Sequence, residues 1–184
     1  MKTLLDAERL RLGVERMADQ IHTAAGDRPI TMIGILTGSI VLLADLIRLM
    51  NMPLRVGVVQ ASSYRGGTQR GELVINYDLM PDIVGRDVWL VDDIFDTGHT
   101  MVQVIRLMNK LGANSIRTAV LCRKDGRQEV DYVPDIVGFD IPDEFVVGYG
   151  LDYQDAYRNL TYLASMEPTD LALNEQDTLN SHND

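Results

Sequence analysis

Three aspartates within five residues form the part of the chain best suited to chemistry. Asp92, Asp93 and Asp96 lie between the apolar segment 88–91 and the sequence Thr97-Gly98-His99-Thr100. A turn that opens a helix presents free backbone N–H groups and the positive end of the helix dipole, which together can bind a phosphate. Helix capping by Asp96 or Thr97 is an alternative use of this turn, but it needs neither Asp92 nor Asp93. The combination predicts a ligand that carries both a phosphate and hydroxyl groups or a cation.

The segment 88–100 resembles the phosphoribosyl pyrophosphate (PRPP) signature of type I phosphoribosyltransferases. Leu36-Thr37-Gly38-Ser39 resembles the pyrophosphate loop of that family, and the segment 61–68 resembles its mobile lid. The segment 134–158 is similar to the purine-binding end of hypoxanthine-guanine phosphoribosyltransferases. The resemblance covers about residues 8–163 in the same order, and it implies an enzyme of purine salvage that makes IMP or GMP from PRPP.

The resemblance also implies a role for each matching residue. Asp96 is the implied catalytic residue, as a general base at N7 of the purine, with orientation of N7 alone as the alternative. For PRPP, the resemblance implies that Asp92 and Asp93 bind the ribose, that the 5′-phosphate is bound by Asp96, Thr97, Gly98, His99 and Thr100, and that pyrophosphate is bound by Thr37, Gly38 and Arg158. For the purine, it implies base binding by Lys124, Phe145, Val146 and Asp152. It also implies Mg²⁺ binding by Asp152 and shielding of the site by the lid residues Ser63 and Tyr64.

Lys124 implies the class of base. An ammonium group donates to a 6-oxo group but not productively to the 6-amino group of adenine, so hypoxanthine and guanine are the expected substrates. Xanthine remains an alternative base. Taken alone, Lys124 and Arg158 would be read as surface charges, Phe145 as a core residue and Asp152 as a turn residue.

Three positions depart from the pattern of the family. Thr37 stands where many relatives carry Lys or Arg, His99 where others carry Lys, and Glu144 where some carry a basic residue. Two cations near the phosphates are therefore missing, so we expect Mg²⁺ and Arg158 to take a larger share of phosphate attraction. The resemblance further implies a cis peptide bond between Leu36 and Thr37, or one that becomes cis when ligand binds.

The elements that must position these residues alternate along the chain. Apolar residues at helical spacing predict helices over 6–24, 39–50 and 100–111, the last one stopped by Gly112. Strands are predicted over 30–36, 54–60, 73–77, 87–91, 115–121 and 136–139, with a short one at 145–147. This alternation predicts an α/β fold, with a twisted, mostly parallel sheet flanked by helices.

Ligands of such sheets bind at the carboxyl ends of the strands. The segments 36–39, 92–100 and 122–124 are each predicted to follow a strand, which agrees with the resemblance to the type I phosphoribosyltransferase fold. We expect one domain over 1–166, with a small hood from about 130–166. Residues 167–184 form an acidic tail that we expect to be disordered.

Composition limits the alternatives. The net charge of −10 argues against a nucleic-acid surface, and therefore against a PRPP-sensing regulator on the same scaffold. Cys122 is the only cysteine, which excludes an intrachain disulfide, favours a structural thiol and predicts a reducing, cytoplasmic compartment. The apolar zone 30–50 is broken by Gly38-Ser39 and contains Asp45 and Arg48, so no membrane segment is expected. The resemblance implies a homodimer or homotetramer.

Overall fold

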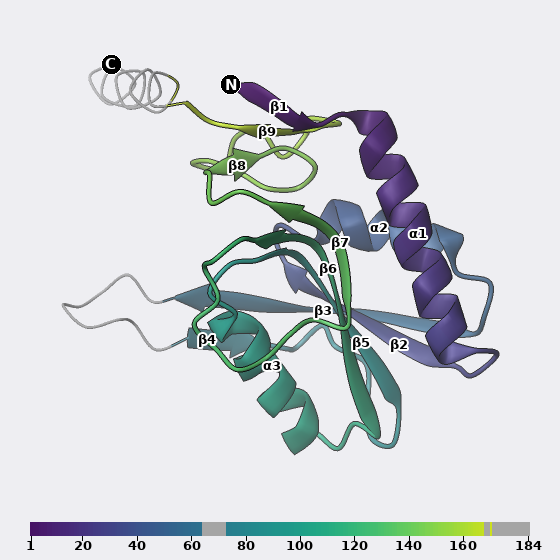
Figure 1. The fold of residues 1–184 in the computed structure, drawn as a ribbon. Coiled ribbons are helices and arrows are strands. Elements are labelled where there is room, and N and C mark those ends of the chain that lie inside the picture. The colour runs from purple at the N-terminus through teal and green to yellow at the C-terminus, as the bar shows by residue number, and fades with distance from the viewer. Residues whose placement is uncertain (64–72, 168–169, 171–184) are drawn as a thin grey trace, which may run out of the picture.

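A central sheet of six strands carries the structure, a computed structural model that describes residues 1–63, 73–167 and 170 (Figure 1). Its order is β4-β3-β2-β5-β6-β7, and all neighbouring strands are parallel except β3 and β4. The strands are β2 (Ile30–Leu36), β3 (Leu54–Ser63), β4 (Leu73–Asn76), β5 (Asp87–Phe95), β6 (Ser115–Lys124) and β7 (Ile136–Ile141). The predicted fold class is confirmed.

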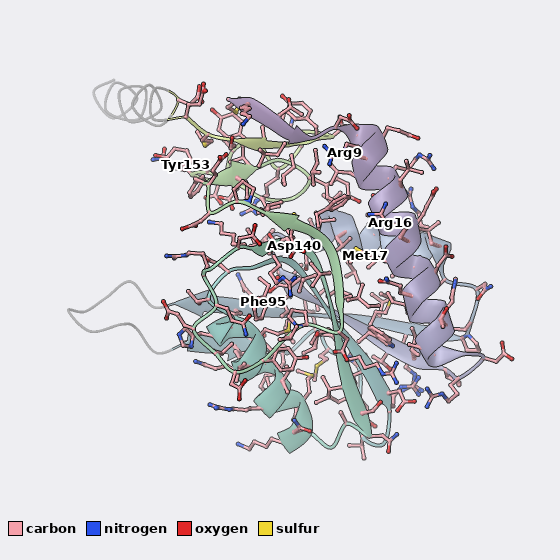
Figure 2. The ribbon with its side chains drawn as sticks, in the orientation of Figure 1. Arg9, Arg16, Met17, Phe95, Asp140 and Tyr153 are labelled. Atoms are coloured by element: carbon pink, nitrogen blue, oxygen red, sulfur yellow. The ribbon has the colours of Figure 1, made fainter. Side chains whose placement is uncertain are left out.

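Helices cover both faces of this sheet. The helices α1 (Ala7–Ala25) and α2 (Ile40–Leu49) pack on one face, and α3 (His99–Lys110) packs on the other. Figure 2 shows Met17 on the side of α1 that faces the sheet, and Met17 is fully buried. All three predicted helices are confirmed to within one residue at each end, because each has a continuous apolar stripe at helical spacing. Among the described residues, no helix is long and apolar enough to cross a membrane.

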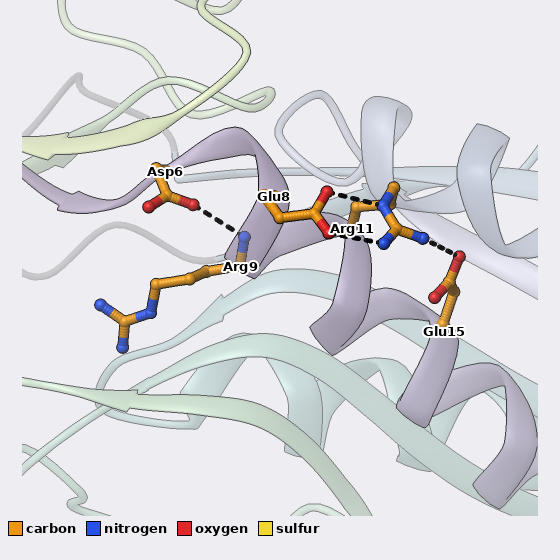
Figure 3. A network of polar contacts seen from close by, with 5 residues as sticks. All are labelled: Asp6, Glu8, Arg9, Arg11 and Glu15. Atoms are coloured by element: carbon orange, nitrogen blue, oxygen red, sulfur yellow. Dashed lines mark hydrogen bonds and ion pairs between the residues drawn. The ribbon is translucent and has the colours of Figure 1, made fainter.

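The first turn of α1 is fixed by side chains (Figure 3). Asp6 caps the helix by accepting a hydrogen bond of 2.8 Å from the backbone N–H of Arg9. Arg11 pairs with both Glu8 and Glu15 on the exposed side of the helix. Exposed ion pairs of this kind contribute little to stability, because water and salt screen them. The buried stripe therefore supplies most of the stability of α1, through Leu10, Val14, Met17, Ala18 and Ile21.

A second, antiparallel sheet of three short strands lies beyond β7, at the top of Figure 1. Its strands are β1 (Lys2–Leu5), β9 (Leu163–Ser165) and β8 (Val146–Val147), in the order β1-β9-β8. The sequence predicts a strand near β8 but none at β1 or β9. Both are too short to show a periodic pattern, and each depends on a partner from the other end of the chain.

The strands β5 and β6 are longer than predicted. Ile94 pairs with Cys122, Phe95 with Arg123, and Lys124 with a residue of β7, so both strands keep their partners to the last residue. Segments 92–95 and 122–124 therefore lie inside the ends of strands, and the prediction that they follow strands is wrong. A residue inside a strand end is held by the sheet, which fixes its side chain more firmly than a loop would.

Candidate active site

The predicted phosphate and ribose residues line one cavity of about 330 Å³. The cavity lies where β2 and β5 end and α3 begins. The site residues in its wall are Gly38, Asp92, Asp93, Asp96, Thr97, Gly98 and Thr100. Segments 36–38 and 92–101, which are separate in the sequence, thus form one concave surface at the carboxyl ends of the strands, as expected for a parallel sheet.

Asp92 is buried, and the adjacent Asp93 is partly buried. Asp92 is only 8% exposed. Burial, and secondly the neighbouring Asp93 carboxylate, raises the pKa of Asp92 well above its ordinary value. Burial also raises the pKa of Asp93, although Arg158 and hydrogen bonds act in the opposite direction. Two adjacent buried carboxyl groups can bind vicinal hydroxyls or a cation, either of which would offset the cost of burying their charge.

Gly38 lies directly against Asp93. A Cβ atom at position 38 would overlap the carboxylate oxygen Oδ2 of Asp93, so no residue with a side chain fits here without moving that carboxylate. The peptide bond that precedes this loop, between Leu36 and Thr37, is cis, and the prediction of a cis bond is confirmed. Thr37 itself is not among the residues that line the cavity.

The helix α3 begins without a side-chain cap. Gly98 is the capping residue, with φ +87°, and no side chain accepts a hydrogen bond from the first turn. A Cβ atom at Gly98 would lie 2.6 Å from Cζ of Phe95, so both the backbone conformation and the space require glycine. Capping by Asp96 or Thr97, the alternative use of this turn, is therefore wrong. The first N–H groups of α3 remain available to an anion in the cavity.

Asp96 makes an ion pair that the sequence did not indicate. Arg127 Nε lies 3.0 Å from Asp96 Oδ1. The backbones of the two segments are also in contact, because the N–H of Glu129 donates to the carbonyl of Thr97 at 3.0 Å. His99 is exposed, does not line the cavity, and has its Nε2 3.0 Å from Glu129 Oε2. The segment 127–130 thus forms an outer layer around the phosphate loop.

The side chain of Lys124 is largely buried and forms an ion pair. Its side chain is 13% exposed, and its Nζ lies 3.5 Å from Asp143 Oδ1. Arg127 Nε lies 3.6 Å from the same oxygen. Lys124 and Asp96, two of the residues predicted to meet the purine, are therefore connected through Asp143 and Arg127. A reading of Lys124 as a solvated surface charge is wrong.

Arg158 connects two residues of the segment that follows β8. Its Nη1 donates to the carbonyl of Gly150 at 2.8 Å, and its Nη2 lies 2.8 Å from Asp152 Oδ1. Arg158 is near enough to Asp93 to lower the pKa of that carboxyl, against the larger effect of burial. Asp152 also accepts a hydrogen bond of 2.9 Å from the N–H of Asp155, so it stabilises the turn as well. This arrangement leaves one cation and one carboxylate at the edge of the site.

Phe145 is 45% exposed, so its reading as a core residue is wrong. Its ring packs edge-to-face on Tyr153, with centroids 5.4 Å apart and planes at 85°. Because almost half of its surface is exposed, Phe145 can contact a flat ligand. Val146 is buried in β8. Of the predicted lid, Tyr64 and the side chain of Ser63 lie outside the described residues.

No group of three or more metal-binding side chains exists in the part of the chain that the structure describes. Mg²⁺ uses one or two carboxylates together with substrate oxygens and waters. Asp152 fits such a partial role, because each of its oxygens has one partner here and can accept more. The residues present therefore suit an ion that arrives with a phosphorylated substrate.

Comparison with known proteins identifies the class. Residues 1–154 match the family model of the phosphoribosyl transferase domain. The chain belongs to the phosphoribosyltransferase family, and the resemblance seen in the sequence is confirmed.

The similar proteins are all named as hypoxanthine or hypoxanthine-guanine phosphoribosyltransferases. The chain is 39% identical over 165 residues to the hypoxanthine-guanine phosphoribosyltransferase of Staphylococcus epidermidis, which covers 89% of this chain and 92% of the relative. It superposes on the hypoxanthine phosphoribosyltransferase of Staphylococcus aureus with a TM-score of 0.86 at 36% identity, covering 92% of each chain. The enzyme of Trypanosoma cruzi gives a TM-score of 0.87 at 32% identity, covering 96% of each chain.

Proposed function

We propose that the protein transfers ribose 5-phosphate from PRPP to hypoxanthine and guanine, giving IMP or GMP and pyrophosphate. The observation that carries this proposal is one cavity that is lined both by the adjacent carboxylates Asp92 and Asp93 and by the uncapped start of α3. A ligand with vicinal hydroxyls and a phosphate matches both features. The family and the names of the relatives agree with this reading.

In the proposed reaction, N9 of the purine forms a bond to C1 of the ribose while the bond from C1 to pyrophosphate breaks. The ring gains positive charge in the transition state, as in glycoside chemistry. Asp92 and Asp93 bind the 2′- and 3′-hydroxyls and hold the ribose in line. The loop from Asp96 to Thr100 binds the 5′-phosphate through backbone N–H groups and hydroxyls, so the reacting atoms meet with little loss of freedom.

The purine is bound from the other side. Phe145 stacks on the ring, the backbone of Val146 reads its Watson–Crick edge, and Lys124 donates to the 6-oxo group. Asp96 faces N7 and accepts its proton as N9 attacks. In the structure Oδ1 of Asp96 is paired with Arg127.

Arg158, with Thr37 and Gly38, receives the departing pyrophosphate. Asp152 would hold Mg²⁺, which would supply positive charge against the pyrophosphate. Arg158 and Asp152 already lie 2.8 Å apart, so a cation and a metal-binding carboxylate occupy the same corner. Ser63 and Tyr64 shield the reacting centre from water.

The test is direct. The protein is incubated with PRPP, Mg²⁺ and one of four bases (hypoxanthine, guanine, xanthine or adenine), and nucleotide formation is followed. We expect IMP and GMP, little XMP or AMP, and no product when a chelator removes the metal, while circular dichroism stays unchanged. The names of the relatives do not favour xanthine. Binding of PRPP without any product would instead support a regulator on the same fold.

We also propose that residues 1–166 form the catalytic domain, that the protein acts in the cytoplasm and that it assembles as a dimer or tetramer. The buried, unpaired thiol of Cys122 suits a reducing compartment. In the Trypanosoma cruzi hypoxanthine phosphoribosyltransferase, the C-terminal region has a role in the oligomeric state and the enzymatic activity. Size-exclusion chromatography with light scattering tests the assembly.

A further inference from the structure

We propose that Arg127 is an additional ligand of the 5′-phosphate, and that it leaves Asp96 when the phosphate binds. The inference rests on the proposed function, because that function supplies the phosphate. It assigns to Arg127 both a binding contact and control over whether Asp96 is free to face the purine.

The first support is the position of Arg127. Its Nε is 3.0 Å from Asp96, the first residue of the phosphate loop. Its segment is fixed to that loop by the hydrogen bond from Glu129 N–H to the Thr97 carbonyl. Val130 lies close to Gly98 on the same loop. The guanidinium of Arg127 therefore already lies beside the loop that is proposed to hold the phosphate.

The second support is the remaining capacity of the guanidinium. The contacts of Arg127 with Asp96 and Asp143 both run through Nε, so these two carboxylates leave the N–H groups of the Nη atoms to other acceptors. A guanidinium presents its donors in a planar fork that matches phosphate oxygens. Arg127 therefore has Nη donors that can engage the phosphate first, before its Nε leaves Asp96.

The third support is charge. His99, which replaces a lysine of many relatives, is exposed and directed at Glu129 rather than at the cavity. Among the described residues, Arg127 makes the one Lys or Arg ion pair to the loop 96–100. A phosphate monoester carries about −1.5 to −2 charges at neutral pH, against −1 for a carboxylate, so it competes successfully for the guanidinium. Asp96 then loses its partner at the moment when the purine needs it.

The experiment compares two ligands that differ only in the phosphate. Binding of GMP and of guanosine is measured by calorimetry, without metal, for the wild type and for Arg127→Met. We expect Arg127→Met to weaken GMP about 10- to 100-fold, as for loss of a charged hydrogen bond. Guanosine affinity should change less than threefold. Arg127→Lys, which keeps the charge but not the fork, should lie between. Arg123→Met removes an arginine that pairs with Asp140 on the same strand end, and should leave GMP affinity unchanged.

Loss of Arg127 also leaves the charge of Asp96 unscreened, and a double variant separates this effect. If Arg127 binds the phosphate, Arg127→Met still weakens GMP when Asp96 is already Asn. If the loss disappears in the Asp96→Asn background, Arg127 only screens Asp96 and the inference is wrong. An equal loss for guanosine and GMP, or no loss for either, also overturns it. Wild-type protein that binds neither ligand overturns the proposed function as well.

Discussion

The carboxylate of Asp93 occupies the space that a side chain at position 38 would fill, because a Cβ atom on Gly38 would overlap Asp93 Oδ2. The loop after β2 and the end of β5 can approach this closely only because residue 38 has no side chain. The position of Asp93 in the cavity therefore depends on a residue that contributes no functional group of its own.

Gly38→Ala tests this dependence. The added methyl group must push the Asp93 carboxylate away, so we expect PRPP affinity to fall at least tenfold, about 1.4 kcal/mol or more. Gly112→Ala is the control, because its nearest neighbour would be 3.6 Å away and its φ of +85° makes it strained but remote from the cavity. That variant should lose stability and keep PRPP affinity. Equal PRPP affinity in Gly38→Ala and wild type would contradict the close packing described here.

The buried Asp92 predicts a pH-dependent stability. Burial raises the pKa of Asp92 above the value in the unfolded chain, about 3.9, so the protonated form favours folding. This contribution is fully present below about pH 4 and is lost as the pH rises through the higher pKa of the folded state. Asp92→Asn mimics the protonated form. We therefore expect its thermal midpoint, measured without ligand at pH 8, to exceed that of the wild type by a few degrees.

Asp87 provides the opposite control. Hydrogen bonds from Ser115 and Asn114 lower the pKa of Asp87, so its ionised form stabilises the fold above the pKa of the unfolded chain. Asp87→Asn should therefore lower the midpoint at pH 8. Asp92→Asn should also bind PRPP poorly, because an amide replaces the carboxylate that meets the ribose. A lower midpoint for Asp92→Asn would show that its charge is compensated within the protein.

Asp96→Asn separates proton transfer from binding. Asparagine fills the same space but cannot accept a proton as a base, so single-turnover nucleotide formation should slow by about 10²–10⁴-fold. The affinity of this variant for PRPP should differ from that of the wild type by no more than a few-fold. Asp140→Asn, which breaks the exposed pair with Arg123, serves as the control and should leave the rate unchanged. A loss under about fivefold would leave Asp96 only the task of orienting N7.

Lys124→Ala addresses the choice of base. Loss of its charged hydrogen bond should weaken hypoxanthine and guanine about 10- to 150-fold, and PRPP affinity should stay within a few times of the wild type. Lys110→Ala, at the exposed end of α3, is the matched loss of one positive charge. Competition binding with each base provides the measurement. Good use of adenine by the wild type would exclude the role proposed for Lys124.

The parts of this structure that follow from local pattern were predictable from the sequence. Each helix has an apolar stripe that one segment carries by itself, so α1, α2 and α3 could be placed to within a residue. The cavity could be predicted because Asp92, Asp93 and Asp96 are close neighbours in the chain and belong to a known family motif. Such features need no knowledge of distant partners.

The parts that depend on distant partners could not be predicted. The pair of Asp96 and Arg127 forms only because the turn after β6 folds back on the phosphate loop, 31 positions away in the chain. Likewise, the extension of β5 to Phe95 depends on β6 being there to pair with it. No local signal marks Arg127 as part of the site, because its own segment carries no motif that points to a phosphate.

The pairing of β1 with β9 has a consequence for synthesis on the ribosome. Lys2 pairs with Ser165, so β1 has no partner until β9, one of the last described segments, has been synthesised. At about 5–20 residues per second, the wait is on the order of 10–30 s. During that time the central sheet can assemble, while β1 and the apolar Leu5 stay exposed to other chains or to chaperones. The central sheet and the cavity at its edge can therefore form before β1 pairs with β9.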